Sequence, residues 1–215
     1  MARRAFGRHC IALAAAALAA GAVAAAPAGP PKTVLIVGDS LSAEYGLARG
    51  AGWVALLEAR LAREGHAAQV VNASISGDTT SGGRSRLPAL LARHKPNVVV
   101  LELGGNDALR GLPLAGTQDN LAAMARAAKA AGAKVLIVGM AMPANYGRRY
   151  AEQFQALFGS VAKAEGAQLV PFLLAGVADG PDADAMFQPD RIHPKAEAHP
   201  RMLANVWPVL APMLR

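Results

Sequence analysis

The sequence predicts a three-layer α/β/α sandwich, flavodoxin-like, built on a mostly parallel sheet of five strands. Short β-branched apolar runs alternate five times with segments whose apolar residues recur at helical spacing. The loops after the apolar runs are rich in glycine and small polar residues, as is typical where parallel strands end at one edge of a sheet. The chain shows no internal repeat, linker or second domain, so its 215 residues indicate one globular domain behind an N-terminal leader.

The first half of the chain contains three predicted strands and two helices. The β-branched run at 34–37 ends abruptly in Gly38-Asp39-Ser40, which indicates a buried strand leading into a turn. Residues 43–52 are rich in glycine and alanine and predict a loop, and helical spacing at 53–61 predicts a helix that stops near Gly65. The other expected elements of this half are a strand at 69–72, a loop at 73–80 that ends in helix-capping residues, a helix through 87–92 and a strand at 98–103.

The second half repeats this alternation. A helix at 117–131 ends at Gly132, the kind of residue that commonly follows a helix. Pro194 stands where a last helix is expected to begin, and that helix is expected to reach nearly to Arg215. The other expected elements are a strand at 134–139, a helix at 149–164, a short strand at 168–170 and a long loop at 175–189.

Residues 1–26 have the layout of a secretory signal peptide. A basic start with three arginines precedes an apolar run at 11–20 and a small-residue stretch suited to cleavage after Ala25, Ala26 or Ala28. An uncleaved anchor helix is the less favoured alternative, because the apolar run is short and alanine-rich for a membrane span. We therefore expect a periplasmic or secreted domain at 27–215, by a general or a twin-arginine export route.

Composition excludes several kinds of site from the mature domain. Cys10 is the only cysteine and lies in the leader, so the domain has no disulfide, thiol nucleophile or thiolate metal site. Removing the three leader arginines leaves 19 basic residues (22 − 3) against 15 acidic ones, a net charge of +4 (19 − 15). The basic residues are scattered with few aromatic residues between them, which does not indicate nucleic-acid binding.

Four features at expected strand ends or loops suit acyl-transfer chemistry. A serine such as Ser40 needs a base to become a nucleophile, and His193 is a suitable base, with Asp190 three residues earlier to hold its Nδ1–H. The oxyanion that forms needs fixed donors, which the backbone at Gly77 and the side chain of Asn106 can supply. Asp39 is interpreted as a turn residue, because Asp190 has the better spacing to the histidine.

These motifs resemble the four blocks of the SGNH, or GDSL, hydrolases in their usual order, over roughly the whole mature chain. The flanking sequences resemble the periplasmic multifunctional acyl-CoA thioesterase, lysophospholipase and arylesterase subfamily. The motif and flanking residues are Gly38-Asp39-Ser40-Leu41-Ser42, 72–79 around Gly77, 104–111 around Asn106, 143–150, and Asp190-Arg191-Ile192-His193-Pro194.

The resemblance implies a serine esterase with nucleophile Ser40, base His193, orienting Asp190, and Gly77 and Asn106 in the oxyanion hole. It also implies no metal or cofactor, and small acyl ester, thioester or lysophospholipid substrates. We expect a monomer that binds no nucleic acid and does not insert stably into a membrane after signal removal. The family commonly has glycine after the triad aspartate, where this chain has an arginine.

Two alternatives remain. A carbohydrate acetylesterase or acetyltransferase of the same type would use the same residues, but only Trp53 and Trp207 are available as large sugar platforms, and both fall in expected helices. A non-catalytic flavodoxin-like binding module would need a phosphate-cradling loop after the first strand, where this chain carries a carboxylate. A Gly-x-Ser-x-Gly motif and a His-Glu-x-x-His zinc motif are both absent from the sequence. The alternatives differ in their prediction for ester turnover.

Overall fold

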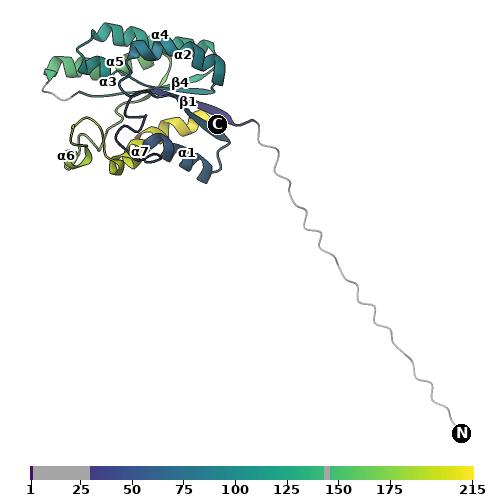
Figure 1. The fold of residues 1–215 in the computed structure, drawn as a ribbon. Helices are drawn as coiled ribbons and strands as arrows, with labels where there is room; N and C mark the ends of the chain where they lie inside the picture. The colour runs from purple at the N-terminus through teal and green to yellow at the C-terminus, as the bar shows by residue number, and fades with distance from the viewer. Residues whose placement is uncertain (2–29, 143–145) are drawn as a thin grey trace.

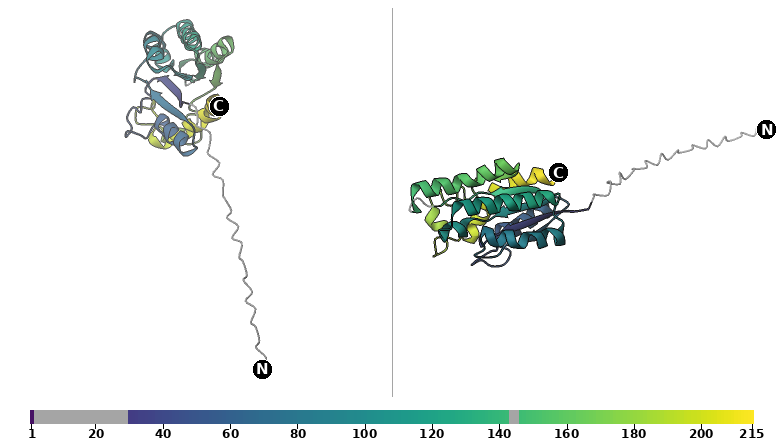
Figure 2. Two further views of the ribbon diagram at one scale, coloured as in Figure 1. Left: turned by 90° about the vertical axis from the view of Figure 1, so that its right-hand side faces the viewer. Right: turned by 90° about the horizontal axis from the view of Figure 1, so that it is seen from above.

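The computed structural model describes Met1, residues 30–142 and residues 146–215. It confirms the predicted three-layer α/β/α sandwich on a sheet of five strands (Figures 1 and 2). The predicted signal peptide lies outside the described residues except for Met1.

The sheet is parallel throughout and has the strand order β2-β1-β3-β4-β5. In this order β1 lies between β2 and β3, so the chain leaves β1 toward one neighbour and later returns to its other side. Such a reversal opens a crevice at the carboxyl ends of the strands, where ligands bind in open α/β sheets. The strands are β1 (Lys32–Gly38), β2 (Ala68–Asn72), β3 (Val98–Glu102), β4 (Lys134–Val138) and β5 (Gln168–Val170).

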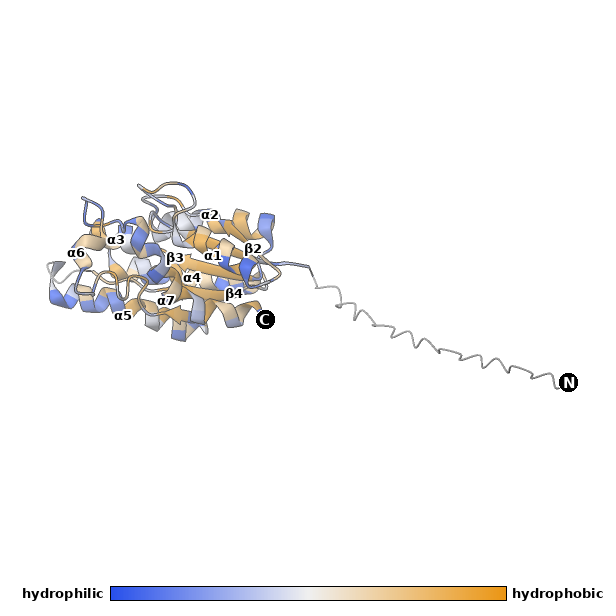
Figure 3. Cartoon of the chain, turned by 90° about the horizontal axis from the view of Figure 1, so that it is seen from below, coloured by the Kyte–Doolittle hydropathy of each residue, from blue (hydrophilic) through white to orange (hydrophobic). Residues whose placement is uncertain are grey.

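Helices cover both faces of the sheet, which explains why the central strands carry apolar runs of four or more consecutive residues, such as 34–37 and 98–101. Along β1, Leu35 and Val37 pack into one core cluster, and Val34 and Ile36 pack into the other, because alternate side chains point to opposite faces. Figure 3 shows the apolar residues concentrated in the strands between the helices. One face carries α2 (Thr80–His94), α4 (Leu114–Ala130) and α5 (Arg148–Glu165), and the other carries α1 (Trp53–Arg63) and α7 (His199–Leu210).

The predicted start of the last helix is wrong. Instead of opening a helix, Pro194 forms an antiparallel bridge with Phe187, and the backbone N–H of Lys195 donates to Met186 O at 2.8 Å. The Gln188 N–H also donates to His193 O at 2.8 Å, and this carbonyl would be the first acceptor of a helix that began at Pro194. The chain becomes helical only at a 3-10 turn (Ala196–Ala198), which leads into α7, and a second 3-10 turn (Ala211–Leu214) ends the chain.

Two short helices lie in segments expected to be irregular. The helix α3 (Gly105–Leu109) begins directly after Gly104, whose φ of +129° lets the chain reverse at the end of β3. The helix α6 (Ala183–Met186) lies within the predicted long loop. Both gather at the carboxyl edge of the sheet, and the C-terminus lies at the opposite end of the domain (Figure 1). Within the described ranges, no helix combines the length and apolar character needed to span a membrane.

Candidate active site

Ser40, His193 and Asp190 form a continuous hydrogen-bonded chain, although the serine and the histidine are 153 positions apart. Ser40 follows β1, and its Oγ lies 2.8 Å from His193 Nε2. His193 Nδ1 lies 2.7 Å from Asp190 Oδ2. This is the geometry of a nucleophile, a base and an orienting carboxylate.

The turn from Asp190 to His193 holds the carboxylate as well as the imidazole. Desolvation acts to raise the pKa of Asp190, but hydrogen bonds from the backbone N–H groups of His193 and Ile192 and from the His193 ring lower it to about 2. The carboxylate is therefore ionised at any physiological pH and fixes the imidazole with Nε2 toward the serine. Arg191 adopts a φ of +57°, a left-handed conformation that favours glycine, which is the residue expected there from the family resemblance.

Tyr45 is a neighbour of the base that the sequence did not reveal. Its ring centroid lies 4.3 Å from that of His193, with a 37° angle between the planes. Gln188 connects the loop that carries Tyr45 to the segment that carries His193, because its Nε2 donates to both Tyr45 O (3.0 Å) and Pro194 O (3.1 Å). The imidazole is thus restrained by a ring contact as well as by Asp190.

The predicted oxyanion donors lie in two segments, Gly77 in the loop after β2 and Asn106 in α3, which follows β3. Asn106, in α3, donates one amide hydrogen of Nδ2 to Asp39 Oδ2 at 3.1 Å, which leaves the second for a substrate oxygen. The backbone N–H groups of Ser40 and Gly77 donate to no partner within the described part of the chain. Ser40, Asn106, Asp190 and His193 line one pocket; Gly77 does not line it, and lies on the neighbouring loop after β2 with a φ of +80°.

Asp39 supports the turn after β1, as expected, and also contacts Asn106, one of the predicted oxyanion donors. Its Oδ1 accepts from the Leu41 N–H at 3.0 Å, and its backbone O accepts from the N–H groups of Ser42 and Ala43. Burial raises the pKa of Asp39 to about 6, and the bonds from Leu41 and Asn106 and the charge of His193 offset only part of that effect. The contact between Asp39 and Asn106 joins residues 67 positions apart, so local sequence did not predict it.

A second buried carboxyl, Glu102, lies beneath the nucleophile turn. Its Oε2 accepts from Ser42 Oγ at 2.6 Å and from the Asp39 N–H at 3.3 Å, and Trp53 Nε1 donates to the same Ser42 Oγ at 3.2 Å. Complete burial, and then the nearby Asp39, raise the pKa of Glu102 well above its ordinary value. The sequence did carry a signal for it: a glutamate that ends the apolar run Val98–Leu101 must be buried with a partner.

His199 has a structural role at the start of α1. Its Nδ1 accepts from the Trp53 N–H at 2.9 Å, which satisfies a backbone donor that a helix start leaves free. Burial lowers the pKa of His199, which keeps the ring neutral and able to accept. The contact connects α7, which follows the segment of Asp190 and His193, to α1, which follows the loop of Ser40.

The pocket beside Ser40 has a volume of about 740 Å³ and a mainly apolar wall. Its size is that of a small-molecule site, and few polar groups other than the triad and Asn106 face it. The apolar lining includes Leu109, Met140, Met142, Tyr146, Phe154 and Phe172. The arrangement suits an apolar chain next to a reactive carbonyl.

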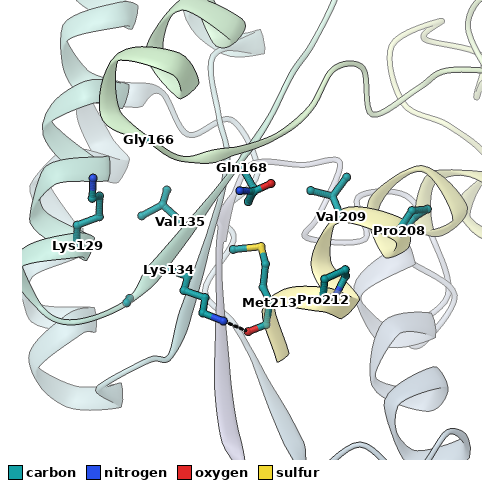
Figure 4. Close-up of a pocket in the computed structure, with 10 residues that line it drawn as sticks. Lys129, Lys134, Val135, Gly166, Gln168, Pro208, Val209, Pro212 and Met213 are labelled. Atoms are coloured by element: carbon teal, nitrogen blue, oxygen red, sulfur yellow. Dashed lines mark hydrogen bonds between the residues drawn. The ribbon is translucent and has the colours of Figure 1, made fainter. Parts of the chain in front are cut away.

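Another pocket, of about 670 Å³, lies at the opposite edge of the sheet, beside the first residues of β4 and β5 (Figure 4). Its two lysines are already occupied with backbone oxygens, because Lys134 Nζ donates to Met213 O at 3.0 Å and Lys129 Nζ donates to Glu165 O at 2.6 Å. No serine, histidine or carboxylate lines it, so it lacks the groups for the same chemistry.

Comparisons with known proteins agree with this geometry. A model of the GDSL-like lipase/acylhydrolase family matches residues 36–201, a range that contains all five predicted site residues. Esterase TesA of Pseudomonas aeruginosa is 57% identical over 183 residues, covering 85% of this chain and 90% of that protein. Thioesterase 1/protease 1/lysophospholipase L1 of Escherichia coli is 45% identical over 168 residues, which are 78% of each chain. A crystal structure of TesA superposes with a TM-score of 0.82 at 56% identity, covering 85% of this chain and 99% of that one.

Proposed function

Since the chain belongs to the GDSL-like lipase/acylhydrolase family and is an ester and thioester hydrolase, we propose that it works through an acyl-enzyme formed on Ser40. The observation that carries this proposal is the hydrogen bond of 2.8 Å between Ser40 Oγ and His193 Nε2, backed by Asp190 at 2.7 Å. A serine hydroxyl becomes nucleophilic only when such a base removes its proton.

In the first half-reaction, His193 Nε2 takes the proton of Ser40 as Oγ bonds to the carbonyl carbon. The tetrahedral intermediate then collapses, and the leaving alcohol or thiol receives that proton from His193. In the second half-reaction, His193 deprotonates a water molecule, which attacks the acyl-enzyme and releases the carboxylic acid and free Ser40. Asp190 remains ionised and stabilises the imidazolium in both halves.

The negative oxygen of each tetrahedral intermediate is stabilised by the free amide hydrogen of Asn106 and the backbone N–H groups of Ser40 and Gly77. The support is that Asn106 Nδ2 is anchored on Asp39 and that both backbone donors lack another partner in the described ranges. Fixed donors of this kind are among the largest contributors to catalysis.

The substrates we propose are acyl thioesters, lysophospholipids and aryl esters with an acyl chain that lies in the apolar pocket. The pocket lining supports this, because each methylene moved from water into it gains about 0.8 kcal/mol. The value of kcat/KM should therefore rise up to about fourfold per methylene until the pocket is filled.

We further propose that the mature enzyme is a periplasmic monomer released from the leader 1–26. The support is the order of basic, apolar and small residues in the leader. N-terminal sequencing of protein from the periplasmic fraction tests the proposal, and a first residue of Met1 or Ala2 would contradict it.

The test of the catalytic proposal is a rate series with p-nitrophenyl esters from acetyl to palmitoyl, together with an acyl-CoA. We expect turnover that increases with chain length in the wild type and is abolished in Ser40→Ala. Ser160→Ala is the matched control, because Ser160 is exposed on α5 and, among the described residues, its Oγ bonds only to Ala156 O. Retained turnover in Ser40→Ala would refute the nucleophile, and turnover confined to acetyl would favour a carbohydrate acetylesterase.

A further inference from the structure

The large apolar side chains that the domain exposes all lie at one edge. Among the described residues, every exposed large apolar side chain except Met1 lies in a segment after a strand's carboxyl end or in the triad loop. These loops gather at the edge that carries α3 and α6 (Figure 1). The six side chains, called the apolar rim below, are Tyr45, Ile75, Leu109, Leu112, Tyr146 and Ile192.

The apolar rim is continuous with the mouth of the active-site pocket. Leu109, Tyr146 and Ile192 line that pocket while remaining at least 38% exposed, and Tyr45 stacks on the catalytic histidine at 50% exposure. Ile75 lies beside the end of β1, because its N–H donates to Gly38 O at 3.0 Å. Exposed apolar patches of this kind mark protein or membrane interaction sites.

Uncompensated positive charge surrounds the same rim. The segments around the rim contain five arginines, all of which are exposed, and none forms an ion pair with a described carboxylate. These segments are 39–52, 73–79, 103–113, the described part of 139–149, and 187–194. The five arginines are Arg49, Arg110, Arg148, Arg149 and Arg191.

The carboxylates of these loops, in contrast, are all engaged. Asp39 and Asp107 are buried, and Asp78 pairs with Arg86 at 2.8 Å. Glu44 accepts from the N–H groups of Gly50 and Gly52, and Asp190 holds the catalytic histidine. The exposed charged side chains of these five segments that have no ion-pair partner among the described residues are therefore all arginines.

Three exposed aspartates, Asp179, Asp182 and Asp184, lie together on the segment between β5 and the triad loop. Asp184 also lines the active-site pocket, so the mouth is acidic on this side and the cationic surface is limited to the other loops around it.

We propose that the apolar rim and its arginines dock the enzyme on the surface of an anionic lipid layer, with the pocket mouth facing the lipid. The arginines match the charge of the head groups, and the rim side chains enter the interfacial region, as in peripheral proteins that combine apolar and basic residues. A single-chain lipid then reaches Ser40 without crossing bulk water. This delivery of substrate rests on the proposed function, but docking itself does not.

Sedimentation of the mature S40A protein with vesicles tests docking without turnover. We expect binding to vesicles of equimolar phosphatidylcholine and phosphatidylglycerol, weakened by salt, and little binding to pure phosphatidylcholine. The R148Q/R149Q variant should bind about 25-fold more weakly, since each arginine near an anionic surface contributes about fivefold. The I75S/L112S variant should also bind more weakly.

The matched control is R63Q/R93Q, which removes the same charge from exposed ends of α1 and α2 at the opposite edge of the sheet. It should bind like the parent protein. When the three double variants are made in the protein that retains Ser40, all of them should keep wild-type turnover of p-nitrophenyl acetate, a soluble ester. Absence of binding to the mixed vesicles, or an equal loss in R63Q/R93Q, would overturn docking while leaving the hydrolase proposal intact.

Discussion

Replacing Asp39 with asparagine should stabilise the protein and impair catalysis at the same time. Asp39 is almost fully buried, and its pKa is raised from 3.8 to about 6. In the unfolded chain the carboxyl loses its proton near pH 3.8, whereas in the folded protein it keeps the proton up to about pH 6. The folded state therefore holds more protons between these values, and the free energy of unfolding falls as pH rises through that window.

The size of the effect follows from the two pKa values. At about 1.4 kcal/mol for each pKa unit, the difference amounts to about 3 kcal/mol, which the wild type loses in full above pH 6. Asparagine has nearly the same shape and does not ionise. Asp39→Asn should thus be more stable than the wild type by up to about 3 kcal/mol at pH 7.5, and equal to it near pH 4.

Catalysis should change in the opposite direction. If the introduced asparagine keeps its oxygen on the Leu41 N–H, its amide nitrogen faces Asn106 Nδ2, and two donors meet where a donor now meets an acceptor. Asn106 must then turn its carbonyl oxygen toward the introduced amide, and it no longer presents an anchored donor to the substrate. Loss of one oxyanion donor lowers kcat about 10²–10³-fold.

Urea denaturation at pH 4 and 7.5, with kcat for a soluble ester, measures both effects. Asn106→Ala provides the control, because Asp39→Asn should cost little further activity once the amide is gone. A variant no more stable than the wild type at pH 7.5 would refute the electrostatic argument. A variant with wild-type kcat would show that Asp39 does not orient Asn106.

Substitutions at three other residues have defined outcomes. Asn106→Ala should lower kcat about 10²–10³-fold at unchanged melting temperature, and a loss under tenfold would remove it as an oxyanion donor. Glu102→Gln should be at least as stable as the wild type in urea at neutral pH, whereas Glu102→Ala should lose about 1–3 kcal/mol by leaving buried Ser42 Oγ without its acceptor. Gly104→Ala should lower the free energy of unfolding by about 1–3 kcal/mol, because φ is +129° and the new Cβ would lie 3.2 Å from the Phe158 ring; unchanged stability would contradict this.

The contacts of His193, the proposed base, illustrate which contacts local sequence can predict. Asp190 and His193 are three residues apart, so a single turn brings them together and their spacing alone predicts the contact. Tyr45 contacts the same ring from a loop far away in the chain, and no local pattern distinguishes it from an ordinary exposed tyrosine. The shifted start of the last helix has a different cause, because a bridge between Phe187 and Pro194, only seven positions apart, competes with the local helix signal.

The sequence by itself determined the layers, the strands and the residue types that the proposed mechanism uses. Burial repeats with the period of each helix or strand, and a nucleophile or base must be one of a few residue types, so both can be predicted from a single chain. Only the tertiary structure decided that Asp39 anchors Asn106, that Glu102 lies beneath Ser42, and that the exposed apolar side chains form one rim. Each of these depends on which loops meet at the sheet edge, and strand order, rather than local pattern, sets that meeting.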